Sequence, residues 1–225
     1  MNSSVKDQHP NHIYIGPDAF AFDLDTHVKY VKIHGVRYFL GPLLRYEYLK
    51  PNAFYAGVDF LASWGNKKFK LTSDRYKFEG KGGIGFANLE LRLGYSCTTK
   101  NGTISPYLGM GAYGFGNTAS KELIGYFATG MRSLFAVNPS FSMGLNLKVF
   151  CAPDAERRFK FRLDGHEKRL REQETIWGGE IGIPLAWYLG ASKRWEIQLE
   201  PYFLKLDFSS VQNIYGTRLL FGYRF

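Results

Sequence analysis

The stretch that decides the fold is ANLELRLGY, residues 87–95, in which large apolar residues alternate with charged, polar or small ones. Successive side chains of an extended strand point to opposite sides. Leu89, Leu91 and Leu93 therefore share one face, and Glu90 and Arg92 share the other. This period of two predicts a β-strand with one apolar and one polar face.

The same alternation recurs along most of the chain, most clearly in segments 141–149, 177–189 and 215–225. Weaker copies occupy segments 36–48, 54–64, 104–112, 127–135 and 195–199, which makes nine predicted strands from about Val36 onward. A tenth candidate, Asn11–Leu24, has an irregular pattern around Pro17 and Asp18. After Pro201 the apolar positions shift by one residue, so we expect a bulge there.

The composition agrees with an all-β chain that can bury a core. Of 225 residues, 45% are hydrophobic and 17% aromatic, and there are 25 glycines, a mixture that disfavours helices. The mean hydropathy is −0.24, and the longest uncharged stretch, residues 101–120, is too rich in glycine for a membrane helix. Residues 1–10 are polar and lack the apolar core of a signal peptide. We expect a disordered segment there and a single domain over residues 11–225.

The predicted connections are of two kinds. Short turns with typical turn residues occur around Pro51, Asn101, Pro139 and Ser192, whereas longer connections cover about residues 65–85, 116–121, 152–175 and 209–213. Short and long connections alternate along the chain. All short turns are therefore expected at one end of the sheet and all long connections at the other.

Two architectures fit this pattern, and they differ in which face points inward. A soluble ligand-binding barrel would turn its apolar side chains inside, whereas a transmembrane barrel would turn them toward lipid. Aromatic residues on the apolar face gather near the short turns, as an interfacial girdle would require, and Trp64 and Trp177 mark a second band. The girdle residues are Tyr46, Tyr48, Phe54, Tyr95, Phe135, Phe141, Trp187, Trp195, Tyr223 and Phe225.

The transmembrane architecture is the better fit, and it asks for an even number of strands. Nine visible strands and the candidate Asn11–Leu24 give ten, with eight as the alternative count. The sequence therefore predicts an all-β protein, an antiparallel up-and-down transmembrane β-barrel.

At its C-terminus the chain resembles bacterial outer-membrane β-barrel proteins. The segment YGTRLLFGYRF, residues 215–225, is similar to the terminal assembly signal of that class, and residues 91–95 and 106–111 are similar to segments of small barrels. Residues 48–60 and 199–207 loosely resemble uncharacterised barrels of chlamydia-like bacteria. The resemblance implies outer-membrane lipid as surroundings and insertion by the barrel assembly machinery. The implied signal residues are Tyr215, Leu219, Phe221, Tyr223 and Phe225.

The polar face of the predicted strands carries many charges that would line the lumen of such a barrel. Two interpretations stand: a network of ion pairs that fills the barrel, or a constricted, weakly anion-preferring pore. The cations are Arg37, Arg45, Arg92, Arg132, Lys148, Arg218 and Arg224. The anions are Glu47, Asp59, Glu90, Glu180, Glu196 and Glu200.

The long connections carry much of the remaining charge of a chain whose formal net charge is +9. Aromatic residues alternate with these charges, so the connections could continue as strands above the membrane. The basic residues could bind lipopolysaccharide phosphates, or they could form a plain solvated surface. A nucleic-acid partner does not suit a barrel in an outer membrane. The candidate anion-binding residues are Lys67, Lys68, Lys70, Arg75, Lys77, Arg157 and Arg158.

Support for catalysis is limited to one pair, Asp164 and His166, in a long connection. Some ten-stranded barrels are proteases that use Asp and His at this end, but no second acidic pair is identifiable here. Two G-x-G-x-x-G stretches, residues 80–85 and 109–114, lack the following helix of a nucleotide site and are expected to give room to bulky neighbours. No cofactor and no metal site is predicted. Cys97 and Cys151 fall a strand length apart, too far for a disulfide.

The sequence thus favours an integral outer-membrane barrel with a structural, surface-interaction or narrow-channel role. The alternatives are an outer-membrane enzyme of protease or lipid-modifying type and a soluble ligand-binding barrel. Side-chain direction separates the first from the last: Leu89, Leu91 and Leu93 point outward in the membrane protein and inward in the soluble one.

Overall fold

The computed structural model describes residues 9–28, 31–72, 77–116, 120–163, 166–207 and 211–225. Regular structure in these ranges consists of β-strands, and within them no helix is long and apolar enough to cross a membrane. The N-terminal segment expected to be disordered lies outside the described residues up to residue 8.

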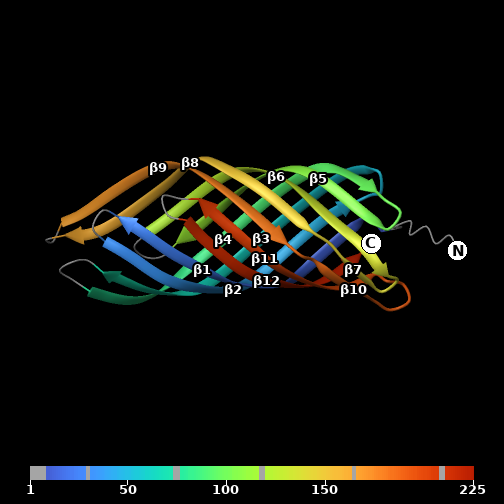
Figure 1. The fold of residues 1–225 in the computed structure, drawn as a ribbon, viewed down its shortest axis with the longest axis horizontal. Coiled ribbons are helices and arrows are strands. Elements are labelled where there is room, and N and C mark those ends of the chain that lie inside the picture. Colours follow the sequence, from blue (N-terminus) through green and yellow to red (C-terminus); the bar gives the residue numbers. More distant parts are fainter. Residues whose placement is uncertain (1–8, 29–30, 73–76, 117–119, 164–165, 208–210) are drawn as a thin grey trace.

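Twelve strands occur in the described ranges, and Figure 1 shows them wound into a tilted barrel. They are β1 (Asn11–Val28), β2 (Val31–Leu49), β3 (Ala53–Thr72), β4 (Lys77–Thr98), β5 (Gly102–Gly116), β6 (Ser120–Asn138), β7 (Phe141–Met143), β8 (Asn146–Leu163), β9 (His166–Gly182), β10 (Leu185–Leu189), β11 (Trp195–Asp207) and β12 (Val211–Arg224).

The strands form one closed antiparallel sheet that crosses the barrel ten times. β1 pairs with β12, so the first and last strands close the sheet. β6 pairs with both β7 and β8, and β11 pairs with both β9 and β10. The short strands β7 and β10 are therefore continuations of β8 and β9. The prediction of a ten-stranded up-and-down barrel is confirmed, and the candidate Asn11–Leu24 is the core of β1.

The two interruptions lie next to each other in the wall. The backbone N–H of Gly144, between β7 and β8, donates to the carbonyl of Pro184, between β9 and β10, at 2.9 Å. The Ser133 hydroxyl on β6 donates to the Leu145 carbonyl at 2.9 Å and accepts from the Leu145 N–H at 3.0 Å. A side chain thus replaces part of the backbone ladder where the strand is broken.

Short turns and long hairpins occupy opposite ends of the barrel, as predicted. Both described chain ends lie at the end with the short turns, whereas the β3–β4 and β8–β9 hairpins extend from the other end (Figure 1). The segments 65–85 and 152–175 are mostly strand: β3 continues to Thr72, β4 starts at Lys77, and β8 continues to Leu163. The suggestion that these connections continue as strands is thus confirmed, and the paired strands satisfy their own backbone groups.

The prediction of a bulge at Pro201 is wrong. β11 pairs with β12 in one unbroken register from Trp195↔Tyr223 to Asp207↔Val211. Leu206 is consequently buried inside the barrel, in phase with Glu196 and Glu200. A register shift of this kind does occur in β8, between Ala152 and Ala155. The sequence change at Pro201 marks a change in what the interior contains, not a shift in the strand.

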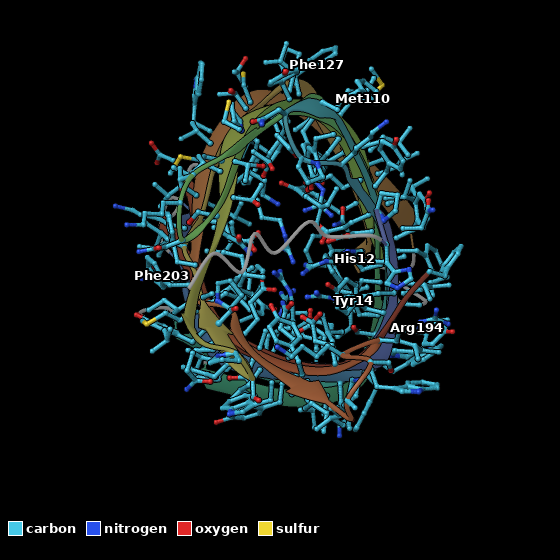
Figure 2. All side chains as sticks on the ribbon, turned by 90° about the vertical axis from the view of Figure 1, so that its right-hand side faces the viewer. His12, Tyr14, Met110, Phe127, Arg194 and Phe203 are labelled. Atoms are coloured by element: carbon cyan, nitrogen blue, oxygen red, sulfur yellow. The ribbon has the colours of Figure 1, made fainter. Side chains whose placement is uncertain are left out.

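The outer wall is apolar. Leu89, Leu91 and Leu93 are 46%, 43% and 58% exposed, and Figure 2 shows Phe127 and Met110 on the outside and Tyr14 and His12 on the inside of the barrel. A ring of exposed large apolar side chains around a closed sheet is the surface that lipid requires. The soluble ligand-binding barrel is therefore excluded, because its apolar side chains would point inward.

The interior is divided into two layers. The half near the short turns is filled by charged and polar side chains, including Arg45, Glu47 and Glu200. The half near the long hairpins is filled by a buried apolar cluster in which Phe20 stacks on Phe39 with ring centroids 4.8 Å apart. We refer to these as the charged layer and the aromatic layer. The prediction of a polar interior holds for the first layer only.

Glycines inside the barrel make room for aromatic rings on the neighbouring strand. A Cβ atom added to Gly111 would lie 2.4 Å from Cζ of Tyr126, its direct cross-strand partner. A Cβ added to Gly216 would lie 2.3 Å from Cζ of Tyr202, which is again the direct partner. Only glycine leaves space for these rings to lie flat on the wall. The packing role expected for the glycines of residues 109–114 therefore agrees with the structure at Gly111.

Candidate functional site

The charged layer is the main concentration of polar groups in the described interior. All thirteen charged residues that the sequence placed in the lumen have the inward-facing parity of their strands, and most are buried. Arg37 lies nearest to the long hairpins, and its guanidinium carbon is 5.6 Å from the centroid of the Phe22 ring. The other twelve lie nearer the short turns. Ion pairs join ten of them into one network, and Arg224 and Glu196 belong to a second cluster.

Arg45 is the hub of this network. Its Nε donates to Oδ1 of Asp59 at 3.0 Å, and its Nη1 donates to Oε2 of Glu200 at 2.8 Å. Arg218 donates to the second oxygen of Glu200 at 2.7 Å and to Glu180 at 2.8 Å. Each carboxylate therefore accepts from more than one donor, which offsets the cost of removing these charges from water.

Several of these contacts run across the lumen rather than along the wall. Arg132 on β6 lies 2.9 Å from Glu47 on β2, and three strands separate β6 from β2 in the sheet. Lys148 on β8 lies 2.8 Å from Glu90 on β4, with two strands between them. These pairs therefore link strands that are not neighbours in the sheet.

A second cluster lies closer to the short turns. Arg224 on β12 donates to Glu196 on β11 at 2.8 Å, and the Tyr14 hydroxyl on β1 donates to Glu196 at 3.4 Å. Nδ1 of His12 lies 3.1 Å from the Tyr14 hydroxyl, and the Arg224 guanidinium lies 4.2 Å from the centroid of the Tyr188 ring. The cluster spans the seam at which β1 and β12 close the barrel.

One charged member of the network was not predicted from the sequence. Asp18 on β1 is buried, accepts a hydrogen bond from the Tyr202 hydroxyl at 3.0 Å and forms an ion pair with Arg218 at 3.4 Å. The apparent irregularity at Pro17 hid it, although Asp18 is in phase with Tyr14 on the same strand. Counting Asp18, seven cations and seven anions face the interior among the side chains that the structure describes. This balance gives no support to an anion-preferring pore.

A cavity of about 70 Å³ lies between the two layers. Arg45, Lys148 and Glu180 contribute to its polar side, and Phe20 and Phe86 to its apolar side. One ordered water needs roughly 10–15 Å³ of such space, so the cavity has room for a few water molecules. It is far smaller than the roughly 300–1,000 Å³ of pockets for organic ligands. Within the described residues no group of three or more His, Cys, Asp or Glu side chains is arranged to hold a metal ion.

The candidate anion-binding residues lie on the long hairpins. Lys67, Lys68 and Lys70 are on β3, where Lys68 is paired with Lys81 and Lys70 with Glu79 of β4. Lys77 begins β4, and Arg157 and Arg158 are on β8. Arg75 lies outside the described residues. The same is true of Asp164, so its proposed pairing with His166, the first residue of β9, is not among the described contacts.

The residues of the expected assembly signal lie on β12 and its end, with Tyr215, Phe221 and Phe225 exposed on the outer face. Cys97 is exposed and Cys151 half-buried, and both are free thiols. Their positions on β4 and β8 agree with the expectation that they form no disulfide with each other.

Comparison with known proteins identifies the fold. No family model and no curated protein matches the sequence. Among solved structures, the chain is similar to the outer membrane protease OmpT from Escherichia coli, with a TM-score of 0.60 and 9% identity over 100% of this chain and 99% of that one. It is also similar to an outer membrane channel from Pseudomonas putida F1, with a TM-score of 0.52 and 9% identity over 100% of both chains.

These two neighbours have different functions, a protease and a channel, so their likeness defines the architecture and not the activity. The chain has the fold of bacterial outer-membrane β-barrels, with a wall built to face lipid.

Proposed function

We propose that the chain is an integral protein of the bacterial outer membrane whose barrel is closed to solutes and whose role lies at the surface. It acts structurally and through its long hairpins, which display basic strands above the membrane. The observation that best supports this proposal is the charged layer. Its ion pairs Arg132–Glu47 and Lys148–Glu90 reach across the lumen, with N–O distances of 2.9 and 2.8 Å.

Two features favour a closed barrel over a narrow channel. The cavity bordered by the charged side chains measures about 70 Å³, and the aromatic layer lies above it. A pore requires a continuous hydrated path, and each layer interrupts such a path by a different kind of contact. Conduction would therefore require both layers to rearrange.

The hairpins supply the surface for interaction. Residues 65–85 contain six basic and two acidic residues, whereas residues 152–175 contain seven basic and six acidic residues. The β3–β4 hairpin is therefore the stronger candidate for binding phosphate groups of lipopolysaccharide, because Lys and Arg recognise phosphate through charge and hydrogen bonds. This charge excess supports a phosphate-bearing partner.

Closure is tested by recording currents after reconstitution in planar bilayers. We expect the wild-type protein to give no stepwise current, because both layers block the lumen. A variant opened in both layers, with Glu47→Ala and Glu90→Ala combined with Phe20→Ala and Phe115→Ala, is expected to conduct. Its folding is checked by heat-modifiable mobility in gels. Regular current steps from the wild-type protein would contradict the proposal.

The surface role is tested with labelled lipopolysaccharide and the folded protein. Replacement of Lys67, Lys68, Lys70 and Lys77 by Gln is expected to weaken binding at least about tenfold, since each basic residue near an anionic surface contributes measurably. Arg157→Gln with Arg158→Gln is the matched control, expected to have a smaller effect because carboxylates are abundant in that hairpin. Equal binding by the wild-type and four-Lys variants would contradict the role of this hairpin.

A further inference from the structure

The barrel end with the short turns carries a second, independent basic surface. Lys50 in the β2–β3 turn, Lys100 in the β4–β5 turn, and Lys193 and Arg194 in the β10–β11 turn are all exposed. The four short turns, at residues 50–52, 99–101, 139–140 and 190–194, contain no Asp or Glu. We call these four basic residues the turn-side rim.

Among the described residues, the acidic side chains nearest to this end point into the lumen and not toward the rim. Glu47 and Glu196 are buried in the lumen, where Glu47 lies 2.9 Å from Arg132 and Glu196 accepts from Arg224 at 2.8 Å. Each is therefore paired with a cation of the lumen. Within the described part of the chain, the rim thus keeps its positive charge toward the outside of the barrel.

Aromatic residues fix the level at which the rim lies. Trp195, Phe54 and Tyr95 are exposed on the outer wall at this end, and Trp195 directly follows Arg194 in the chain. Trp and Tyr in such positions occupy the membrane–water interface. The rim residues lie at or just beyond these aromatics, toward the turns, which is the level of the lipid headgroups.

The turn that carries two of the basic residues has a defined backbone. Gly190 and Lys193 have φ values of +72° and +51°, which fold the turn tightly, and the Arg194 carbonyl accepts from the Arg224 N–H at 2.9 Å. Arg194 is thereby held against the end of β12. The backbone position of Arg194, next to Trp195, is therefore well defined.

We propose that the turn-side rim binds the phosphate groups of anionic phospholipids in the leaflet that this end of the barrel faces. Phosphates in the headgroup plane are the anions that this position meets, and guanidinium and ammonium groups bind them by charge-assisted hydrogen bonds. The proposal rests on the lipid-facing wall alone, and it stands or falls independently of the closed lumen and of the hairpin surface.

The test uses Trp195 as a local probe of lipid composition. A variant with Trp64, Trp177 and Trp187 replaced by Phe keeps one tryptophan, next to Arg194. It is reconstituted in mixed phosphatidylglycerol and phosphatidylcholine vesicles in which one or the other lipid is brominated. At equal mole fraction, brominated phosphatidylglycerol is expected to bind next to Trp195 about fivefold more strongly than brominated phosphatidylcholine, as judged by quenching.

The quenching ratio is the quenching of Trp195 by brominated phosphatidylglycerol divided by that by brominated phosphatidylcholine. The double substitution Lys193→Gln with Arg194→Gln is expected to bring this ratio close to one. Adding Lys50→Gln and Lys100→Gln is expected to leave the ratio near one. The control variant keeps Trp64, in the opposite band, as the single tryptophan, and its quenching ratio should not respond to the same substitutions. A ratio near one with the intact rim would overturn the proposal. So would a preference for phosphatidylglycerol that survives removal of all four basic residues. Binding of soluble polyglutamate without any lipid preference would instead assign the rim to an acidic protein partner.

Discussion

At the scale of single residues, the interior is organised by glycines that face aromatic rings. Gly111 accommodates the ring of Tyr126, whose hydroxyl donates to Glu90 in the charged layer at 2.8 Å. Gly125, one strand away, faces outward and has no neighbour within 4 Å of an added Cβ. The same residue type is thus constrained at one position and unconstrained at the other.

This contrast gives a matched pair of substitutions. Gly111→Ala is expected to lower the free energy of unfolding by about 1–3 kcal/mol, because the Tyr126 ring and the wall must move apart. Gly125→Ala is expected to be neutral within about 0.5 kcal/mol. Urea unfolding from lipid vesicles measures both. Equal stability of the two variants would show that the ring does not lie on Gly111.

Charged residues of the interior could largely be identified from sequence, because strict alternation around Glu90, Arg92 and Lys148 fixed their face. Asp18 could not, since Pro17 and Pro42, which are direct cross-strand partners, interrupt the apolar pattern of the outer face. The contacts between the charged residues of the interior could not be predicted from the sequence either. Arg132 meets Glu47 only because three intervening strands curve the sheet into a closed barrel. Periodicity assigns a face to a residue, whereas closure decides which residues meet.

At the scale of elements, β11 shows why an apparent phase shift can mislead. Tyr202 and Leu206 point inward in the same register as Glu196 and Glu200, and Lys205 and Asp207 point outward. Where the strand passes from the charged to the aromatic layer, its inner face becomes apolar. A pattern of large residues on both faces then resembles a shift of one position.

The unbroken register of β11 predicts opposite roles for two neighbouring residues. Leu206→Ala is expected to lower the free energy of unfolding by about 2–5 kcal/mol, as for other buried Leu residues. Lys205→Ala, on the outer face, is expected to stay within about 0.5 kcal/mol. Guanidinium unfolding of the two folded variants compares them. If Lys205→Ala lowered the free energy of unfolding more than Leu206→Ala, Lys205 would be the inward-facing residue, and β11 would contain a bulge at Pro201.

The strands themselves were predictable where one face is apolar and the other polar, as in residues 87–95. The long hairpins were less so, because aromatic and charged residues alternate there instead of apolar and polar ones. Their pairing continues upward from the barrel, as in the run from Trp64↔Gly85 to Thr72↔Lys77, so tertiary context extends a pattern that is weak by itself.

At the scale of the whole molecule, the barrel combines an apolar wall, a charged layer and an aromatic layer. The sequence indicated the wall and the charges, and it left open whether the charges form a network or a pore. The layering supports our proposal of a filled barrel, because Phe20, Phe86 and Phe115 pack over the cavity that the charges border. The basic hairpins and the turn-side rim lie at opposite ends of this barrel.

The central claim is that the apolar face of the sheet lies in lipid and the charged face inside the barrel. Nitroxide labels placed one at a time at residues 88–94, in a protein with Cys97 and Cys151 replaced by Ser, test it by their accessibility to oxygen in bilayers. We predict high accessibility at residues 89, 91 and 93 and low accessibility at residues 88, 90, 92 and 94. High accessibility at the even-numbered positions, or no alternation, would contradict the account.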